Sequence, residues 1–177
     1  MNIEHRLSIT RGALLSRLDA VQTRFLIDIG VNELTSLVSF RLAPLSTRRD
    51  IAMLGVLHRT MLGKGPNQFS EFFQRDPQHP HKFLDPRIAT KSPLIKRSAL
   101  GLVAVYNMLP HRVVRAKSVS AFQSCLQDLC IELATSNFPQ WSEALSPRLP
   151  LTSHPLTKFF SLPQLTDTER ATIIFFA

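Results

Sequence analysis

The acidic side chains of this sequence are too scattered to predict a two-metal catalytic centre. Such a centre needs clustered carboxylates, because several oxygens must hold each cation. Asp19, Asp28, Asp50, Asp76 and Asp85 instead stand singly along the chain. The sequence also lacks phosphate-binding glycine loops, zinc-protease motifs, Cys-x-x-Cys pairs and nucleophile elbows. We therefore expect no catalytic residue, no metal site and no cofactor, and hence a chain that is not an enzyme.

The histidines and cysteines indicate structure rather than chemistry. His58 falls inside an apolar helical stripe, where a hydrogen-bonded core histidine is more common than a catalyst or a ligand. His79 and His81 flank a proline and lack a nearby cysteine or acidic ligand, so we expect two solvent-exposed histidines. Cys125 and Cys130 stand roughly 140° apart round a predicted helix, which favours two reduced thiols over a disulfide.

Basic residues are the one feature that points to a function. The chain has 21 Lys and Arg against 13 Asp and Glu, a net charge of +8. This excess favours polyanionic partners, nucleic acid first and an anionic membrane second. The candidate nucleic-acid-binding residues are Arg17, Arg24, Arg48, Arg49, Arg59, Lys64, Arg112, Arg115 and Lys117. Helical phase separates Arg48 from Arg49, so no single patch can use them all, and solvated surface charge is the alternative for each.

The central element is a helix predicted between Ala43 and Pro66. Ser46 or Thr47 can cap its first turn, and Gly63 stands where a helix commonly ends in a left-handed glycine. The apolar stripe of this helix is formed by Ile51, Leu54, Leu57, Met61 and Leu62, with His58 inside it. A second line is formed by Arg48, Ala52, Gly55 and Arg59. This line predicts a shallow groove for a neighbouring helix or, as the alternative, for a phosphate.

Five further segments carry helical patterns. Residues 8–29 are predicted to form a helix that ends at Gly30. Its apolar stripe consists of Leu14, Leu18, Val21, Phe25 and Ile29. Asn32 is predicted to cap a short helix over residues 33–40. Residues 67–73 form another, anchored by Phe69, Phe72 and Phe73. The apolar run 97–109 fits a buried helix better than a strand, and Pro110 ends it. Ser118 or Ser120 is predicted to cap a helix over residues 119–134.

Two proline-rich stretches complete the chain. Residues 74–96 show no period and are predicted to form a loop or a disordered linker. Residues 135–177 are predicted to form a largely disordered tail without a core of its own. The predicted fold class is therefore all-α, a small irregular helical domain of about five to six helices within residues 1–134, followed by the poorly ordered tail.

The sequence also bears on the cellular compartment. No apolar run approaches the ~20 residues that span a bilayer, and the N-terminus lacks a signal-peptide core. Together with two reduced cysteines, this predicts an intracellular protein, nuclear or cytoplasmic, without a membrane partner.

Three stretches of the sequence follow one another in a characteristic order. They are LDAVQTRFLIDIGV (18–31), LAPLSTRRDIAMLGVLHRTMLGKGP (42–66) and RSALGLVAVYNMLPHRVVRAKSVSAFQSCL (97–126). Together they resemble the region that follows the polymerase core in reverse transcriptases of non-LTR (LINE-type) retrotransposons. The resemblance covers about residues 14–133 and implies a helical region that supports template or partner contacts. The palm and its paired aspartates are absent here, which implies a truncated or degenerate fragment.

These observations leave two hypotheses for the function. The leading one is a non-catalytic helical fragment of a retrotransposon RNA-directed DNA polymerase, with at most weak, salt-sensitive binding to RNA or DNA. The alternative is a helical protein-interaction module whose exposed apolar faces are completed by the missing polymerase core or by another protein.

Overall fold

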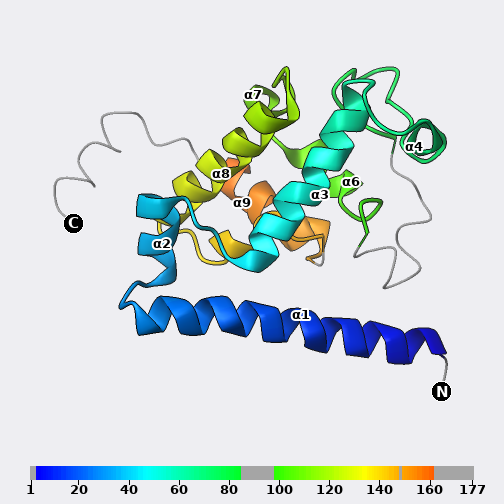
Figure 1. Ribbon diagram of the computed structural model, residues 1–177. Coiled ribbons are helices and arrows are strands. Elements are labelled where there is room, and N and C mark those ends of the chain that lie inside the picture. The colour runs from blue at the N-terminus through cyan, green and yellow to red at the C-terminus, as the bar shows by residue number, and fades with distance from the viewer. Residues whose placement is uncertain (1–2, 85–97, 148, 162–177) are drawn as a thin grey trace, which may run out of the picture.

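The computed structural model describes residues 3–84, 98–147 and 149–161 (Figure 1). In these ranges the chain is helical, as predicted, and β-pairing is limited to one isolated bridge between Arg75 and Phe83. The described α-helices are α1 (Ile3–Asp28), α2 (Glu33–Phe40), α3 (Leu45–Met61), α4 (Asn67–Phe72), α6 (Val103–Met108), α7 (His111–Val114), α8 (Val119–Thr135) and α9 (Pro155–Ser161). Two short 3-10 turns, η2 (Trp141–Glu143) and η3 (Leu151–Ser153), lie between α8 and α9.

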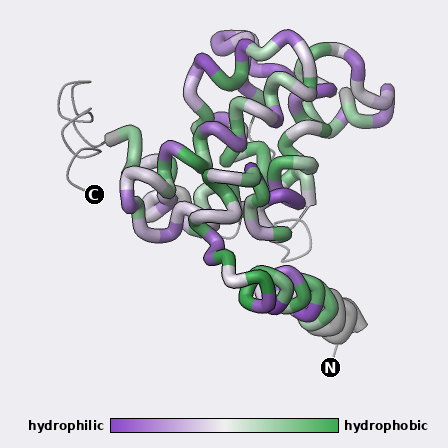
Figure 2. The backbone as a smooth tube through the Cα atoms, turned by 60° about the vertical axis from the view of Figure 1, so that its left-hand side comes forward, coloured by the Kyte–Doolittle hydropathy of each residue, from purple (hydrophilic) through white to green (hydrophobic). Residues whose placement is uncertain are grey.

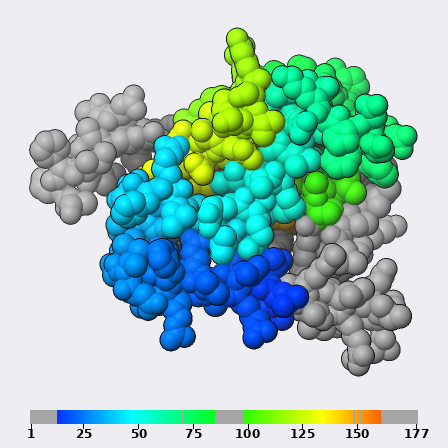
Figure 3. All heavy atoms as spheres, in the orientation of Figure 1, coloured from blue at the N-terminus to red at the C-terminus, as the bar shows by residue number. Residues whose placement is uncertain are grey.

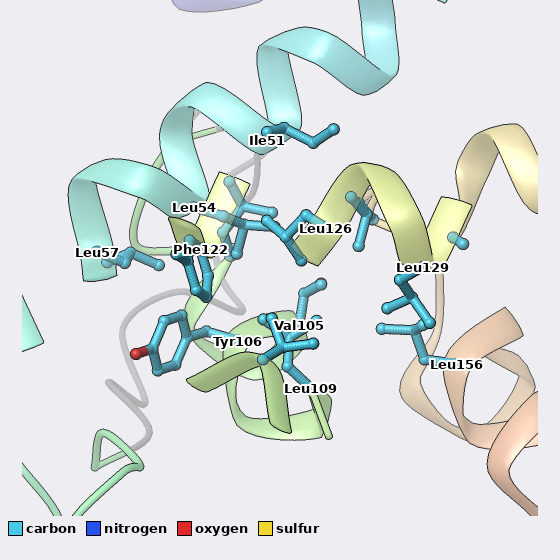
Figure 4. Close-up of a cluster of buried hydrophobic side chains, with 14 of the residues drawn as sticks. Ile51, Leu54, Leu57, Val105, Tyr106, Leu109, Phe122, Leu126, Leu129 and Leu156 are labelled. Carbon is cyan, nitrogen blue, oxygen red and sulfur yellow. The ribbon is translucent and has the colours of Figure 1, made fainter. Parts of the chain in front are cut away.

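The core is built on α3 and α8, which pack against each other with fully buried leucines (Figure 4). The predicted buried stripe of α3 is confirmed for Ile51, Leu54, Leu57 and Met61, whereas Leu62 is half-buried. Gly55 lets the helices approach closely, because a Cβ there would lie 2.6 Å from Gln123 Nε2 and 3.3 Å from Val119 Cγ1. The predicted groove on α3 therefore receives a neighbouring helix at Gly55.

Two predicted helix caps and one predicted glycine end are confirmed, and one predicted cap is wrong. Asn32 caps α2 by accepting a hydrogen bond from the Thr35 N–H at 2.7 Å, and Ser118 caps α8 by accepting one from the Ala121 N–H. Gly63 adopts the predicted left-handed conformation, with φ +72°. The expected side-chain cap of α3 is wrong, because its N-cap residue is Pro44 and no side chain caps the first turn. The Thr47 hydroxyl instead donates to the Ser142 carbonyl at 2.7 Å.

The segment after α8 belongs to the core, so the predicted tail without a core is wrong for its described part. Ala144, Leu145, His154 and Leu156 are fully buried, and the last of these meets Leu129 of α8 in Figure 4. The prolines here separate short 3-10 and helical turns, which pack on α8 despite lacking a long period. Residues 162–177 lie outside the described residues.

The first part of the predicted loop is ordered. Phe83 is buried, and the Asn107 side chain holds it by accepting from the Phe83 N–H at 3.0 Å and donating to its carbonyl at 2.8 Å. Of the expected anchors in the preceding helix, Phe73 is buried and Phe69 partly buried, but Phe72 is exposed. Residues 85–96 lie outside the described residues.

The apolar run after that loop forms a shorter helix than predicted. Residues 98–102 are turns, and α6 covers only Val103–Met108 before the predicted stop at Pro110. Val103, Val105 and Tyr106 are buried, so the segment supplies core residues in spite of its short helix.

The first helix lies at the edge of the molecule. Figure 1 shows α1 along the bottom, and Figure 2 views it almost end-on, with the rest of the chain on one side. It ends as predicted near Gly30, which has φ +70°. Of the described residues of α1, Leu26 is the one that is buried.

Candidate functional site

Three of the candidate basic residues are engaged with side chains of other helices. The Arg49 guanidinium forms a bidentate pair with the Asp19 carboxylate, at 2.9 and 3.0 Å. Arg48 Nη2 donates to Gln22 Oε1 at 3.2 Å, and Arg112 pairs with Glu132 of α8. A guanidinium whose fork is already occupied by a carboxylate has fewer donors left for a phosphate. We therefore assign Arg49 and Arg112 to internal contacts.

Arg48 and Arg49 attach α1 to α3. Although helical phase separates them on α3, both reach α1, where Asp19 and Gln22 lie one turn apart. Gln22 Nε2 adds a bond to the Ala43 carbonyl at 3.2 Å, and Leu26 supplies the buried apolar contact. Among residues 13–28 of α1, whose burial is described, the attachment therefore combines these polar bonds with one fully buried leucine, in contrast with the apolar packing of α3 on α8.

Four other candidates gather at the far end of α3. Arg59, Lys64, Arg115 and Lys117 are all exposed. His58 Nε2 lies 2.8 Å from the Ala116 carbonyl, which brings the end of α3 beside the segment that carries Arg115 and Lys117. The Arg59 Nε–H donates to the Lys64 carbonyl at 2.9 Å, which ties those two together. These four residues are called the α3-end basic cluster below.

Arg17 and Arg24 do not belong to that cluster. Both are exposed on α1, which lies along the opposite side of the molecule from α7 in Figure 1. Within the described part of the chain, neither forms an ion pair. The structure therefore divides the predicted basic residues into internal contacts, one cluster and one separate pair.

The most exposed apolar surface also lies on α1. The predicted stripe of Leu14, Leu18, Val21, Phe25 and Ile29 forms on a helix, but its side chains are 51–66% exposed. A surface helix usually turns such a stripe toward a core. Here the stripe lies on a helix whose described residues run along the lower edge of the molecule in Figure 3. These five residues are called the α1 apolar stripe.

Helical phase explains why the stripe is left uncovered. At roughly 100° per residue, the contact face formed by Asp19, Gln22 and Leu26 lies roughly 90° round the axis from the centre of the stripe. The polar bonds to α3 therefore orient α1 with its stripe beside the contact rather than in it. Sequence periodicity detects the stripe but not this rotation, which depends on partners 21 to 30 residues away.

His58 occupies a fully buried polar site, as predicted for a core histidine. Because the Ala116 carbonyl can only accept, Nε2 carries the proton, and Nδ1 accepts the Tyr106 hydroxyl at 2.9 Å. The ring stacks on Phe122 with a centroid distance of 4.1 Å. Burial lowers the pKa of His58 and raises that of Tyr106. Both hydrogen bonds are formed by the neutral ring with its proton on Nε2. Through them, His58 of α3 is bonded to α6 and to the turn before α8.

The histidines of the loop are only partly as predicted. His79 is exposed, but it has an acidic neighbour after all, since its Nδ1 lies 2.9 Å from Asp76 Oδ2. The Gln78 N–H and His79 hold the pKa of Asp76 below its usual value. His81 is half-buried, with its ring 5.2 Å from that of His111. Among the described residues, no three His, Cys, Asp or Glu side chains are grouped to bind a metal.

The two cysteines are free thiols, as predicted. Cys130 is buried on α8, and burial raises the pKa of its thiol to about 12, whereas Cys125 is half-buried. No helix in the described ranges is long and apolar enough to cross a membrane.

Comparison with known proteins adds no relative to this description. No family model, no curated protein and no solved structure matches the chain. The candidate functional surfaces of this chain are therefore the α1 apolar stripe and the α3-end basic cluster.

The buried state of His58 predicts a pH dependence of stability. The folded pKa lies below the unfolded value of 6.5, so the unfolded chain takes up the proton first as pH falls. The stabilisation is complete above pH 6.5 and is lost below it. We expect the free energy of unfolding, measured with urea, to fall between about pH 7.5 and 5.5 by about 1 kcal/mol more in wild type than in His58→Gln.

Burial also lowers the pKa of His154, so His154 makes the free energy of unfolding fall with pH in both the wild type and His58→Gln. The comparison with His58→Gln therefore isolates His58. Equal losses in the two proteins would contradict the assignment of His58 as a neutral histidine in the folded state.

Proposed function

We propose that this chain is a non-catalytic helical module that binds another protein through the α1 apolar stripe. The observation that carries the proposal is the exposure of five large apolar side chains, each more than half exposed, in one line along α1. Leu14, Leu18, Val21 and Phe25 lie on the helix, and Ile29 follows directly after its end. Exposed apolar residues scattered singly over a surface are ordinary, but a contiguous stripe marks an interaction site.

The expected energy of docking suits a reversible contact. Burying the exposed half of a large apolar side chain contributes about 1 kcal/mol, so the whole stripe contributes about 5 kcal/mol. Association costs at least a comparable amount in lost translational and rotational freedom. The stripe alone would therefore bind weakly, and a stable complex needs further contacts beside it.

The resemblance to non-LTR reverse transcriptases supports the same proposal. The stretches that carry it supply α3, α6 and α8, whose residues Leu54, Tyr106 and Phe122 meet in one core (Figure 4). The stretch 18–31 supplies the C-terminal half of α1, including part of the stripe. In our proposal the chain derives from the region that follows the polymerase core, and the stripe docks on that core or on another protein.

The proposal predicts that a neutral apolar dye, Nile red, binds this chain at the α1 apolar stripe. We expect Val21→Asp/Phe25→Asp to lower Nile red fluorescence by at least about half, while the free energy of unfolding changes by less than about 1 kcal/mol because both side chains are exposed. The matched control is Ala20→Asp/Ile27→Asp, which adds the same charge to exposed positions on the other side of α1.

The control should leave the dye signal unchanged. Ile27 is informative because it is 70% exposed, more than any residue of the stripe, but stands alone on its face. If the two double variants lowered the fluorescence equally, or if neither did, the stripe would not be a docking surface.

Nucleic-acid binding is a second candidate, favoured by the α3-end basic cluster. Four exposed cations on adjoining segments can neutralise about four phosphates, which gives weak and strongly salt-dependent binding. Because Arg48, Arg49 and Arg112 are engaged within the protein, this surface is smaller than the full set of basic residues suggests.

This candidate predicts a specific change in salt dependence. Fluorescence anisotropy with a single-stranded RNA of about 20 nucleotides, between about 50 and 200 mM salt, should show binding that weakens with salt. Arg115→Glu/Lys117→Glu should flatten the logarithmic salt slope by about 1.5 or more. Arg17→Glu/Arg24→Glu makes the same charge change outside the cluster and should leave most of that slope. Absence of binding at low salt, or equal effects of both variants, would exclude the cluster.

A further inference from the structure

We infer that the occupant of the α1 apolar stripe is an amphipathic helix with acidic flanks, supplied by a protein other than a second copy of this chain. The inference rests on the proposed function, because it names the partner of the same surface. Its evidence is the spacing of the stripe and the charges on the two sides of the stripe.

The spacing of the stripe suits a helical partner. Leu14, Leu18, Val21 and Phe25 follow one another at intervals of four, three and four residues, the spacing of the a and d positions in a coiled coil. The next position of this pattern is Asp28, and Ile29 lies just past the end of α1, so the apolar seam from Leu14 to Phe25 runs for roughly 17 Å along the helix. A straight apolar seam of this length and period is complementary to the seam of another helix.

Both sides of the seam are basic. On the outer side, Arg17 and Arg24 are seven residues apart and flank the stripe at equivalent positions. On the inner side, the Arg48 guanidinium lies against Gln22, and its Nε is buried without a hydrogen-bond partner. Asp19, three residues before Gln22, is paired with Arg49. A helix seated on the stripe would therefore lie between positive charges on both sides.

One acid lies close to the seam. Asp28 is exposed and occupies the seam position that follows Phe25, at the C-terminal end of α1. It reduces the positive charge at that end and leaves the middle of the seam basic. An incoming helix with glutamate or aspartate on both flanks would oppose Arg17, Arg24 and Arg48 with favourable charge.

The same charges disfavour a second copy of the chain. In an antiparallel pair, the outer side of one α1 would meet the outer side of the other, so that Arg17 and Arg24 would face the same arginines. In a parallel pair, the outer side of one copy would meet the inner side of the other, where Arg48 lies. Either arrangement brings like charges together, which costs binding free energy.

The test uses two synthetic model helices of about three heptads, each with leucine at a and d. One carries glutamate and the other lysine at every e and g position. Fluorescence anisotropy of the labelled peptides with the full chain, in about 0.15 M salt, should show binding at least about tenfold tighter for the glutamate peptide. Arg17→Glu/Arg24→Glu should remove or reverse this preference.

Val21→Asp/Phe25→Asp should abolish binding of the glutamate peptide, and the control Ala20→Asp/Ile27→Asp should preserve it. Equal, stripe-dependent binding of both peptides would overturn the inference while leaving the stripe as a docking surface. Absence of binding by either peptide would also overturn it, and Nile red would then decide the proposed function independently.

Two further measurements test the other possible occupants of the stripe, a second copy of this chain and a lipid surface. Sedimentation equilibrium would reveal self-association that Val21→Asp/Phe25→Asp abolishes, and this result would assign the stripe to a second copy. Stripe-dependent binding to vesicles of phosphatidylcholine and phosphatidylserine, without a preference for the glutamate peptide, would assign it to a lipid surface. Either result would contradict an acidic helical partner.

Discussion

The close approach of α3 and α8 at Gly55 is the contact on which the rest of the structure depends. A larger residue there would meet Gln123 and Val119, so the depth of this packing follows from the missing side chain. Several other elements attach to the same pair of helices. Arg41 after α2 pairs with Asp128 of α8 at 2.6 Å, Thr47 of α3 bonds to Ser142 of η2, and His58 of α3 bonds to Tyr106 of α6.

The attachment of α1 differs in kind from that of the other helices. It depends on a bidentate arginine pair, two bonds of Gln22 and one buried leucine, rather than on an apolar face. Partly exposed ion pairs of this type contribute only about 1 kcal/mol or less each. Their main effect is on orientation, because they fix the rotation of α1 and leave its apolar stripe exposed. In this account, the same polar contacts that hold the helix also present the binding surface.

Much of the helical framework could be predicted from the sequence, because it depends on local signals. The caps at Asn32 and Ser118, the left-handed Gly63 and the buried stripe of α3 all follow from residue types at fixed spacing. His58 could be predicted as a core residue from its place in the α3 stripe. Each of these features involves residues within a few positions of one another.

The features that sequence reasoning missed depend on distant partners. Thr47 has the type of a capping residue, but its hydroxyl bonds to Ser142, nearly one hundred residues away. The segment that contains Leu145 and Leu156 lacks a helical period, and only the surface of α8 makes it part of the core. Likewise, nothing near Arg49 in the sequence shows that Asp19 occupies its guanidinium. For this reason, the sequence does not show which candidate basic residues are engaged within the protein, or that the stripe is left uncovered.

The most direct test of this account is the solvent accessibility of individual methyl groups, measured by NMR with a soluble, uncharged gadolinium chelate. If α1 presents its stripe to solvent, the methyl signals of Leu18 and Val21 should relax as fast as those of the exposed Leu34. The methyls of Leu37 and Leu54, which are fully buried, should be protected. Protection of Leu18 and Val21 to the level of Leu54 in the isolated chain would contradict the account, because the stripe would then already be covered.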